Sequence, residues 1–190
     1  MIKLRYATPA SWAKQIIDHM DEFLPDHAAA EKKASSMAMT MVAHYPDREA
    51  LVQAMIDLAL EELGHFRAVV KIMHKRGLKL LPDEKDHYVN ALRKHMRDGT
   101  SAYLMDRLLV AGIIEARGAE RFGLVANALP DGDLKRFYQS ITRSEEAHHG
   151  LFLDLAKIYF DKSDLGRRLD ELLEAEAAIM RDLPQRPALH

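Results

Sequence analysis

The sequence contains no cysteine. This absence excludes disulfides, zinc–thiolate sites, cysteine-ligated iron–sulfur clusters and a cysteine nucleophile. Any bound metal must therefore be held by histidine and carboxylate side chains, which suit iron, manganese or zinc. Histidine is abundant by contrast, with 10 in the 190 residues.

The sequence also lacks an excess of charge and a long apolar run. Lys and Arg number 27 against 29 for Asp and Glu, so the chain is not a polycation that binds nucleic acid through bulk charge. No run approaches the roughly 18 apolar residues of a membrane-spanning helix. No apolar segment follows Lys3 and Arg5, as it would in a signal peptide. We therefore expect a soluble, cytoplasmic protein that does not contact a membrane.

Glycine and proline are scarce, and the prolines, with Gly77, Gly99 and Gly132, fall at the ends of segments of helical periodicity or between them. No stretch alternates apolar and polar residues as a half-buried strand does. The pattern predicts a single all-α domain over residues 1–190, a bundle of four long helices with additional short helices. We expect the core helices within about 25–160, with Pro25 opening the first, and an irregular tail over 184–190. The expected helices cover about 9–23, 25–45, 47–76, 84–97, 101–127, 133–160 and 163–182.

Each long helix carries one acid on its apolar face, and the four acids are Glu31, Glu62, Glu115 and Glu145. Burying a carboxylate without a partner costs several kcal/mol, so four in one core need a shared cation. A histidine follows the second and fourth acid by three residues, on the same helical face. Two Glu and two Glu-x-x-His motifs from four helices form the ligand set of di-iron or di-manganese carboxylate bundles.

An internal repeat supports this ligand set. Glu115 lies 84 residues after Glu31, and both members of the second Glu-x-x-His pair lie 83 residues after those of the first. Two helical hairpins of the same design would bring all six side chains to one centre. The alternative is that these residues are buried and hydrogen-bond one another. The predicted metal ligands are Glu31, Glu62, His65, Glu115, Glu145 and His148.

Two further Glu-x-x-His pairs fit the pattern less well. Glu84 and His87 lie in a short helix with no partner acid, and Glu146 and His149 are one residue out of register. A metal pair with open positions can reduce dioxygen. The residues alone leave open an oxygenase, a ferroxidase or storage protein, and a manganese catalase.

Several segments resemble a known family over roughly residues 5–180. They include the first-helix run Asp26-His27-Ala28-Ala29-Ala30-Glu31-Lys32-Lys33-Ala34 and the run Glu61-Glu62-Leu63-Gly64-His65-Phe66. They also include Ile114-Glu115-Ala116-Arg117-Gly118-Ala119-Glu120-Arg121-Phe122 and Ser144-Glu145-Glu146-Ala147-His148. These motifs are similar to those of the bacterial tRNA 2-methylthio-isopentenyl-adenosine hydroxylase family (MiaE).

The resemblance implies a ferritin-like fold and a non-haem di-iron monooxygenase. It implies hydroxylation of the isopentenyl side chain of the hypermodified adenosine just 3′ of the tRNA anticodon. The implied cofactors are two iron ions, with dioxygen as co-substrate. The implied partners are the tRNA anticodon loop and a reductase or ferredoxin that supplies two electrons.

Other residues near the ligands have two interpretations each. Glu61 could hold a ligand histidine by its ring N–H or be exposed, and Tyr138 could donate to a ligand or pack in the core. His27, one turn before Glu31, is an alternative ligand. Arg117 could contact RNA or pair with Glu120 as a buried ion pair. The full set of RNA-binding candidates is Lys32, Lys33, Arg117, Arg121 and Arg143.

Two alternative functions remain open at this point. One is a ferritin-like protein that oxidises or binds iron, although storage would require a cage of many subunits. The other is a di-iron hydroxylase of another small apolar substrate, such as a quinone.

Overall fold

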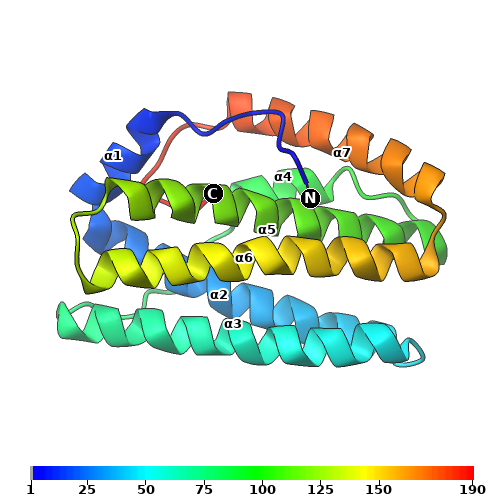
Figure 1. Ribbon diagram of the computed structural model, residues 1–190, viewed down its shortest axis with the longest axis horizontal. Coiled ribbons are helices and arrows are strands. Elements are labelled where there is room, and N and C mark those ends of the chain that lie inside the picture. Colours follow the sequence, from blue (N-terminus) through cyan, green and yellow to red (C-terminus); the bar gives the residue numbers. More distant parts are fainter. Residues whose placement is uncertain (1) are drawn as a thin grey trace. The chain divides into compact units, whose positions relative to one another are not determined.

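A computed structural model describes residues 2–190 of the protein (Figure 1). This part of the chain contains seven helices and no β-strand, which confirms the predicted all-α class. Four of the helices have 25 to 29 residues, and they are the four that carry the predicted ligands. The helices are α1 (Ala10–Asp18), α2 (Met20–His44), α3 (Glu49–Lys75), α4 (His87–Arg93), α5 (Thr100–Ala128), α6 (Asp133–Tyr159) and α7 (Lys162–Asp182). Among residues 2–190, no helix combines the length and the apolar character needed to cross a bilayer.

The chain divides into two compact units, which we describe separately. The first unit comprises the chain up to Lys14, Lys85–Arg186 and His190. The second comprises Gln15–Glu84 and Pro187–Leu189. The single domain over residues 1–190 stays a prediction.

The second unit is built on the hairpin of α2 and α3, which run antiparallel (Figure 1). Residues 45–48 join the two helices, and Pro46 prevents α2 from continuing. The buried side chains of each helix recur at helical spacing, and Leu51, Met55 and Leu58 are examples on α3. Between the helices, the Ser35 hydroxyl donates a hydrogen bond of 2.8 Å to the carbonyl of Ala59.

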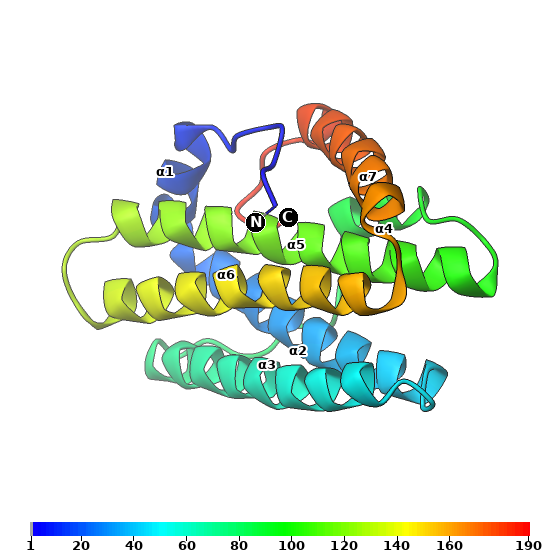
Figure 2. The same cartoon turned by 45° about the vertical axis from the view of Figure 1, so that its right-hand side comes forward.

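The first unit is built on the antiparallel hairpin of α5 and α6, joined by residues 129–132. α5 is buried around most of its circumference, and small residues let its neighbours come close. A methyl group at Gly112 would lie 3.2 Å from Ile2 Cδ1 and 3.4 Å from Phe152 Cβ, so glycine fits where a larger side chain would not. α7 packs against α4, α5 and α6 and is inclined to α5 in both views of the molecule (Figures 1 and 2).

A buried ion pair holds α7 to α5. The Arg117 guanidinium donates to Glu176 Oε1 from Nε at 2.9 Å and from Nη2 at 2.7 Å, and both side chains are inaccessible to solvent. The Tyr88 hydroxyl of α4 donates to the same oxygen at 3.1 Å. Arg117 also donates to the carbonyl of Tyr6 at 2.9 Å and pairs with Glu120. One arginine thus ties the N-terminal segment, α5 and α7 together.

The start of the second helix differs from the prediction. Pro25 lies inside α2 rather than at its beginning, and the chain leaves helical geometry at His19, with φ −124° and ψ 36°. Proline at this place removes one helical hydrogen bond, to the carbonyl of residue 21. Phe23 and Leu24, which lie within that turn just before Pro25, are fully buried, and their packing outweighs the lost bond. The short helix α4 is also shorter than predicted, since Asp86 caps it by accepting from the Val89 N–H at 2.9 Å.

Candidate metal centre

The second unit carries a triad of Glu31 on α2 with Glu62 and His65 on α3. His65 Nδ1 lies 3.3 Å from Glu62 Oε2 and 3.5 Å from Glu31 Oε2. One donor atom from each of the three side chains lies within 4.8 Å of the others. The two carboxylates are almost completely buried, at 3% and 1% exposed, as predicted from their place in an apolar stripe.

The acids of this triad control the charge of His65. Burial alone lowers the pKa of its imidazole, but hydrogen bonds and charge from Glu31 and Glu62 outweigh burial and raise the pKa to about 10. The same negative charge would favour a divalent cation at this triad. A cation bound through His65 Nδ1 would require loss of the proton from that nitrogen.

His27 is the partner of Glu31 rather than a member of the triad. Its Nε2 lies 2.6 Å from Glu31 Oε1, and its ring is fully buried and stacks on Phe23. Burial, followed by the charge on His65, lowers the pKa of His27 to about 3, so its imidazole is neutral. Because an ionised carboxylate can only accept, Nε2 carries the hydrogen and donates it to Glu31.

The first unit carries a matching triad of Glu115 on α5 with Glu145 and His148 on α6. His148 Nδ1 lies 3.8 Å from Glu145 Oε2 and 3.9 Å from Glu115 Oε2. Donor atoms of these three side chains also lie within 4.8 Å of one another, and all three side chains are buried. A methyl group at Gly118 would lie 3.6 Å from Glu145 Oε2, so a side chain larger than that would press on this carboxylate.

The donor set of each triad fits a divalent metal ion. Two carboxylates supply oxygen ligands and one imidazole supplies nitrogen, a combination suited to iron, manganese or zinc. In both triads Nδ1 is the ring nitrogen that lies beside the two carboxylates. Each hairpin can thus hold a metal ion with residues that the sequence had singled out.

The neighbours of the triads differ in burial. The Glu61 carboxylate is half exposed and lies 3.9 Å from His65 Nε2, at the outer limit of an ion pair. Tyr138 is fully buried, and its ring stacks on Phe122 with centroids 5.8 Å apart. Glu146 is exposed, whereas its motif partner His149 is buried, which the sequence pattern did not reveal.

The predicted RNA contacts divide by exposure. Lys32 and Arg143 are exposed, and Lys33 is half-buried. Lys32 donates a hydrogen bond of 2.7 Å to Asp83, and Lys33 donates one of 2.7 Å to the carbonyl of residue 84. Arg117 is fully buried in its ion pairs with Glu120 and Glu176, so the structure corrects the expectation that it contacts RNA. Arg121 is 5% exposed and lines a cavity.

The chain is similar to known proteins over nearly its whole length. Residues 2–190 match the model of the family described as tRNA-(MS[2]IO[6]A)-hydroxylase (MiaE). The chain is 34% identical over 183 residues to the tRNA 2-(methylsulfanyl)-N(6)-isopentenyladenosine(37) hydroxylase of Pseudomonas putida, which covers 96% of this chain and 89% of that protein. It is 33% identical over 156 residues to the hydroxylase of the same name from Salmonella typhimurium, covering 82% of this chain and 57% of that protein.

A solved structure is also similar. It is described as protein 43 with aldehyde deformylating oxygenase activity from Synechococcus, and it is 34% identical in sequence. The TM-score is 0.94, and the match covers 100% of this chain and 96% of the other. This likeness supports the predicted ferritin-like fold class.

Proposed function

Because the chain belongs to the tRNA-(MS[2]IO[6]A)-hydroxylase (MiaE) family, we propose that it hydroxylates the isopentenyl side chain of 2-methylthio-isopentenyladenosine at position 37 of tRNA. The observation that carries the proposal is the pair of buried Glu, Glu, His triads, one on each long hairpin. Such triads are typical of proteins that use metal ions to activate dioxygen. The repeat spacing of 83 and 84 residues supports their joining in one centre.

We propose two iron ions as the cofactor, with Glu31, Glu62, His65, Glu115, Glu145 and His148 as ligands. When bound, the iron pair would supply the reduction of dioxygen, with two electrons from the reductase, that hydroxylation of a C–H bond of the isopentenyl side chain requires. Four carboxylates carry four negative charges, which balance two divalent ions and remove the cost of burying either set of charges separately. His27 orients Glu31 through its hydrogen bond of 2.6 Å, and Glu61 is the candidate partner for His65 Nε2.

The proposed partners are the tRNA anticodon loop and a reductase or ferredoxin that supplies two electrons. A single-stranded loop nucleotide is inexpensive to turn out of its stack, so its prenyl chain can enter the protein. Lys32, Lys33 and Arg143 remain candidates for contact with the RNA backbone. A tRNA-modifying enzyme would act in the cytoplasm, as the sequence predicts.

The direct test is a reaction with the iron-loaded protein, dioxygen, a reductant and prenylated tRNA. After digestion, mass spectrometry of the nucleosides should show one oxygen atom added to the prenylated adenosine. A filled metal site without that addition contradicts the proposal. Iron oxidation that proceeds while the tRNA stays unmodified would instead favour the ferritin-like alternative.

The ligand set has its own test. Glu115→Ala should lower the bound iron below two ions per chain, because it removes a carboxylate from one triad. Glu146→Ala is the matched control, since this exposed glutamate is adjacent to Glu145 and outside both triads. Metal analysis of the two purified variants measures the difference. Two irons per chain in Glu115→Ala would show that the ligand set is wrong.

A further inference from the structure

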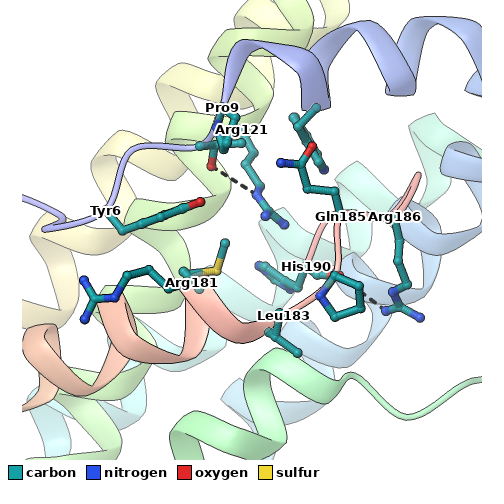
Figure 3. A pocket seen from close by; sticks show the side chains of 12 residues that line it. Tyr6, Pro9, Arg121, Arg181, Leu183, Gln185, Arg186 and His190 are labelled. Atoms are coloured by element: carbon teal, nitrogen blue, oxygen red, sulfur yellow. Dashed lines mark hydrogen bonds between the residues drawn. The ribbon is translucent and has the colours of Figure 1, made fainter.

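A second feature of the first unit has the composition of a binding site. A cavity of about 220 Å³ lies between the N-terminal segment, α5 and the C-terminal tail (Figure 3). Its lining includes Arg121, Arg181 and Arg186, and no aspartate or glutamate of the described chain belongs to it. The hydroxyl of Tyr6, the amide of Gln185 and the imidazole of His190 add polar groups. The lining thus offers donors and positive charge to a ligand.

Arg121 forms the buried part of this cavity. Its guanidinium lies between Tyr6 and Gln185 in the close view (Figure 3), and only 5% of the residue is exposed. The Thr8 hydroxyl accepts from its Nε at 3.4 Å, and its Cζ lies 4.8 Å from the centre of the Trp12 ring. These contacts fix the orientation of the guanidinium before any ligand arrives.

Burial and electrostatic repulsion act together on this group. Burial first, and then the neighbouring Arg117, lower the pKa of Arg121 to about 10. The cost of holding a second cation beside Arg117 falls when an anion lies next to it. Glu120 and Glu176 act on the pKa of Arg121 in the opposite direction, but neither carboxylate belongs to the lining of the cavity.

His190 provides an independent observation. Its Nδ1 lies 2.9 Å from Asp86 Oδ2, and its ring stacks on Tyr88 with centroids 4.8 Å apart. Its Nε2 is buried and has no hydrogen-bond partner among the described residues. A buried polar nitrogen without a partner is rare in native proteins and calls for a ligand or a water molecule. The contact with Asp86 occupies Nδ1, so Nε2 is the ring nitrogen that is left to contact a ligand.

We propose that this cavity binds a phosphate group. The planar guanidinium of Arg121 supplies donors that match the acceptor oxygens of a phosphate, and Arg181 and Arg186 add positive charge to the lining. A cavity of about 220 Å³ is smaller than the about 300–1,000 Å³ typical of drug-sized ligands, so it admits a phosphate with little attached bulk. The phosphate could come from the RNA backbone, which rests on the proposed function, or from inorganic phosphate.

The first experiment uses inorganic phosphate and the full-length protein stripped of metal, at constant ionic strength. Phosphate should raise the melting temperature of the wild type and bind in calorimetry. Arg186→Gln should weaken that binding about ten-fold, since it removes a positive charge from the lining and the hydrogen bond of 3.4 Å from Arg186 Nη2 to the carbonyl of His190. Arg167→Gln is the matched control, because Arg167 is exposed on α7 and does not line the cavity. Arg121→Lys, which keeps the charge and loses the planar fork, gives a second variant at the buried position.

Glu115→Ala is the control that distinguishes this cavity from the metal centre. It removes a proposed metal ligand and should leave phosphate binding unchanged. No effect of phosphate on the wild type, or equal binding by Arg186→Gln and Arg167→Gln, overturns the proposal. These readouts need no hydroxylation, so they stand whether or not the proposed function does.

The second experiment identifies the source of the phosphate. An anticodon stem-loop RNA is titrated by fluorescence anisotropy over a range of salt concentrations. With the RNA backbone as source, Arg186→Gln weakens RNA binding and lowers the salt slope by about one. With inorganic phosphate as source, Arg186→Gln weakens the binding of inorganic phosphate, whereas Arg186→Gln and Arg167→Gln bind the RNA equally well.

Discussion

At the scale of single residues, the contact between His27 and Glu31 explains how one candidate ligand is held. The imidazole is neutral and donates Nε2–H to the carboxylate at 2.6 Å. The remaining carboxylate oxygen, Oε2, is the one that lies 3.5 Å from His65 Nδ1. His27 therefore selects which oxygen of Glu31 belongs to the triad.

We expect His27→Ala to weaken metal binding about 10- to 100-fold, which is the usual loss when the partner of a metal ligand is removed. His27→Gln should recover part of the affinity, because an amide N–H can occupy the place of Nε2–H. Titration with Fe²⁺ under anaerobic conditions measures both. Equal affinity in wild type and His27→Ala would show that this hydrogen bond does not support the ligand.

Some residue-scale features could be predicted from the sequence and others could not. Glu31, Glu62, Glu115 and Glu145 were identifiable because an acid in an apolar stripe is costly, and all four are buried. The ion pair of Arg117 with Glu176 joins positions 59 residues apart on different helices, and no local spacing signals such a contact. The cavity was not predictable for the same reason, since its lining comes from both ends of the chain.

At the scale of elements, α7 is held to α5 by the oxygen of Glu176 that accepts from Arg117 and Tyr88. Glu176→Ala leaves the buried arginine without its main partner, so we expect a loss of about 3–5 kcal/mol in the free energy of unfolding. Glu174 lies two residues before Glu176 and is exposed, so Glu174→Ala should lower the free energy of unfolding by less than about 1 kcal/mol. Urea denaturation of both variants measures the difference. Similar values for the two would mean that α7 is held by apolar packing alone.

Asp106 joins α5 to α7 and to the segment before α5. Burial alone would raise the pKa of its carboxyl, but hydrogen bonds from Arg97 and Arg168 outweigh burial and lower it. A carboxyl with a lowered pKa in the folded state contributes stability above its unfolded pKa of about 4 and loses it as the pH falls further.

We therefore expect protonation of Asp106 to cause part of the loss of folding stability in acid. Stability of the wild type should decrease below about pH 4, and Asp106→Asn should be less stable at pH 7 with a shallower decrease in acid. Thermal unfolding across pH 3–7 provides the comparison. An unchanged slope in Asp106→Asn would assign the acid sensitivity to other carboxylates.

The helices themselves were largely predictable from periodicity and from the placement of proline and glycine. The exception is the break before α2, which falls at His19 and not at Pro25. A single proline is a local signal, whereas the burial of Phe23 and Leu24 depends on tertiary packing that no local rule contains.

At the scale of the whole molecule, the proposed metal ions should contribute to stability. Ions that bind the folded chain and not the unfolded one add about 2.7 kcal/mol at a concentration 100 times the dissociation constant. For a chain of this length we expect the melting temperature to rise by about 5–10 °C with Fe²⁺ and to fall again with a chelator. Differential scanning calorimetry measures the shift. Glu145→Gln should lose most of it, while a full shift in that variant would place the ions elsewhere.

The charge of the whole chain also acquires a different meaning. Four of its 29 acidic residues are buried in the triads, so the net charge of −2 understates the positive character of the surface. The sequence alone excluded bulk electrostatic attraction to RNA but could not show where positive groups gather. The structure locates one such group of arginines around a cavity.

The two hairpins have a consequence for how the protein reaches its native state. Each triad is contained in two consecutive helices joined by a four-residue turn, so its members meet through contacts that are close in sequence. Contacts of this kind form early, because little chain entropy is lost in closing a short loop. The three side chains of each proposed metal-binding triad would therefore meet before contacts form between parts of the chain that are distant in sequence.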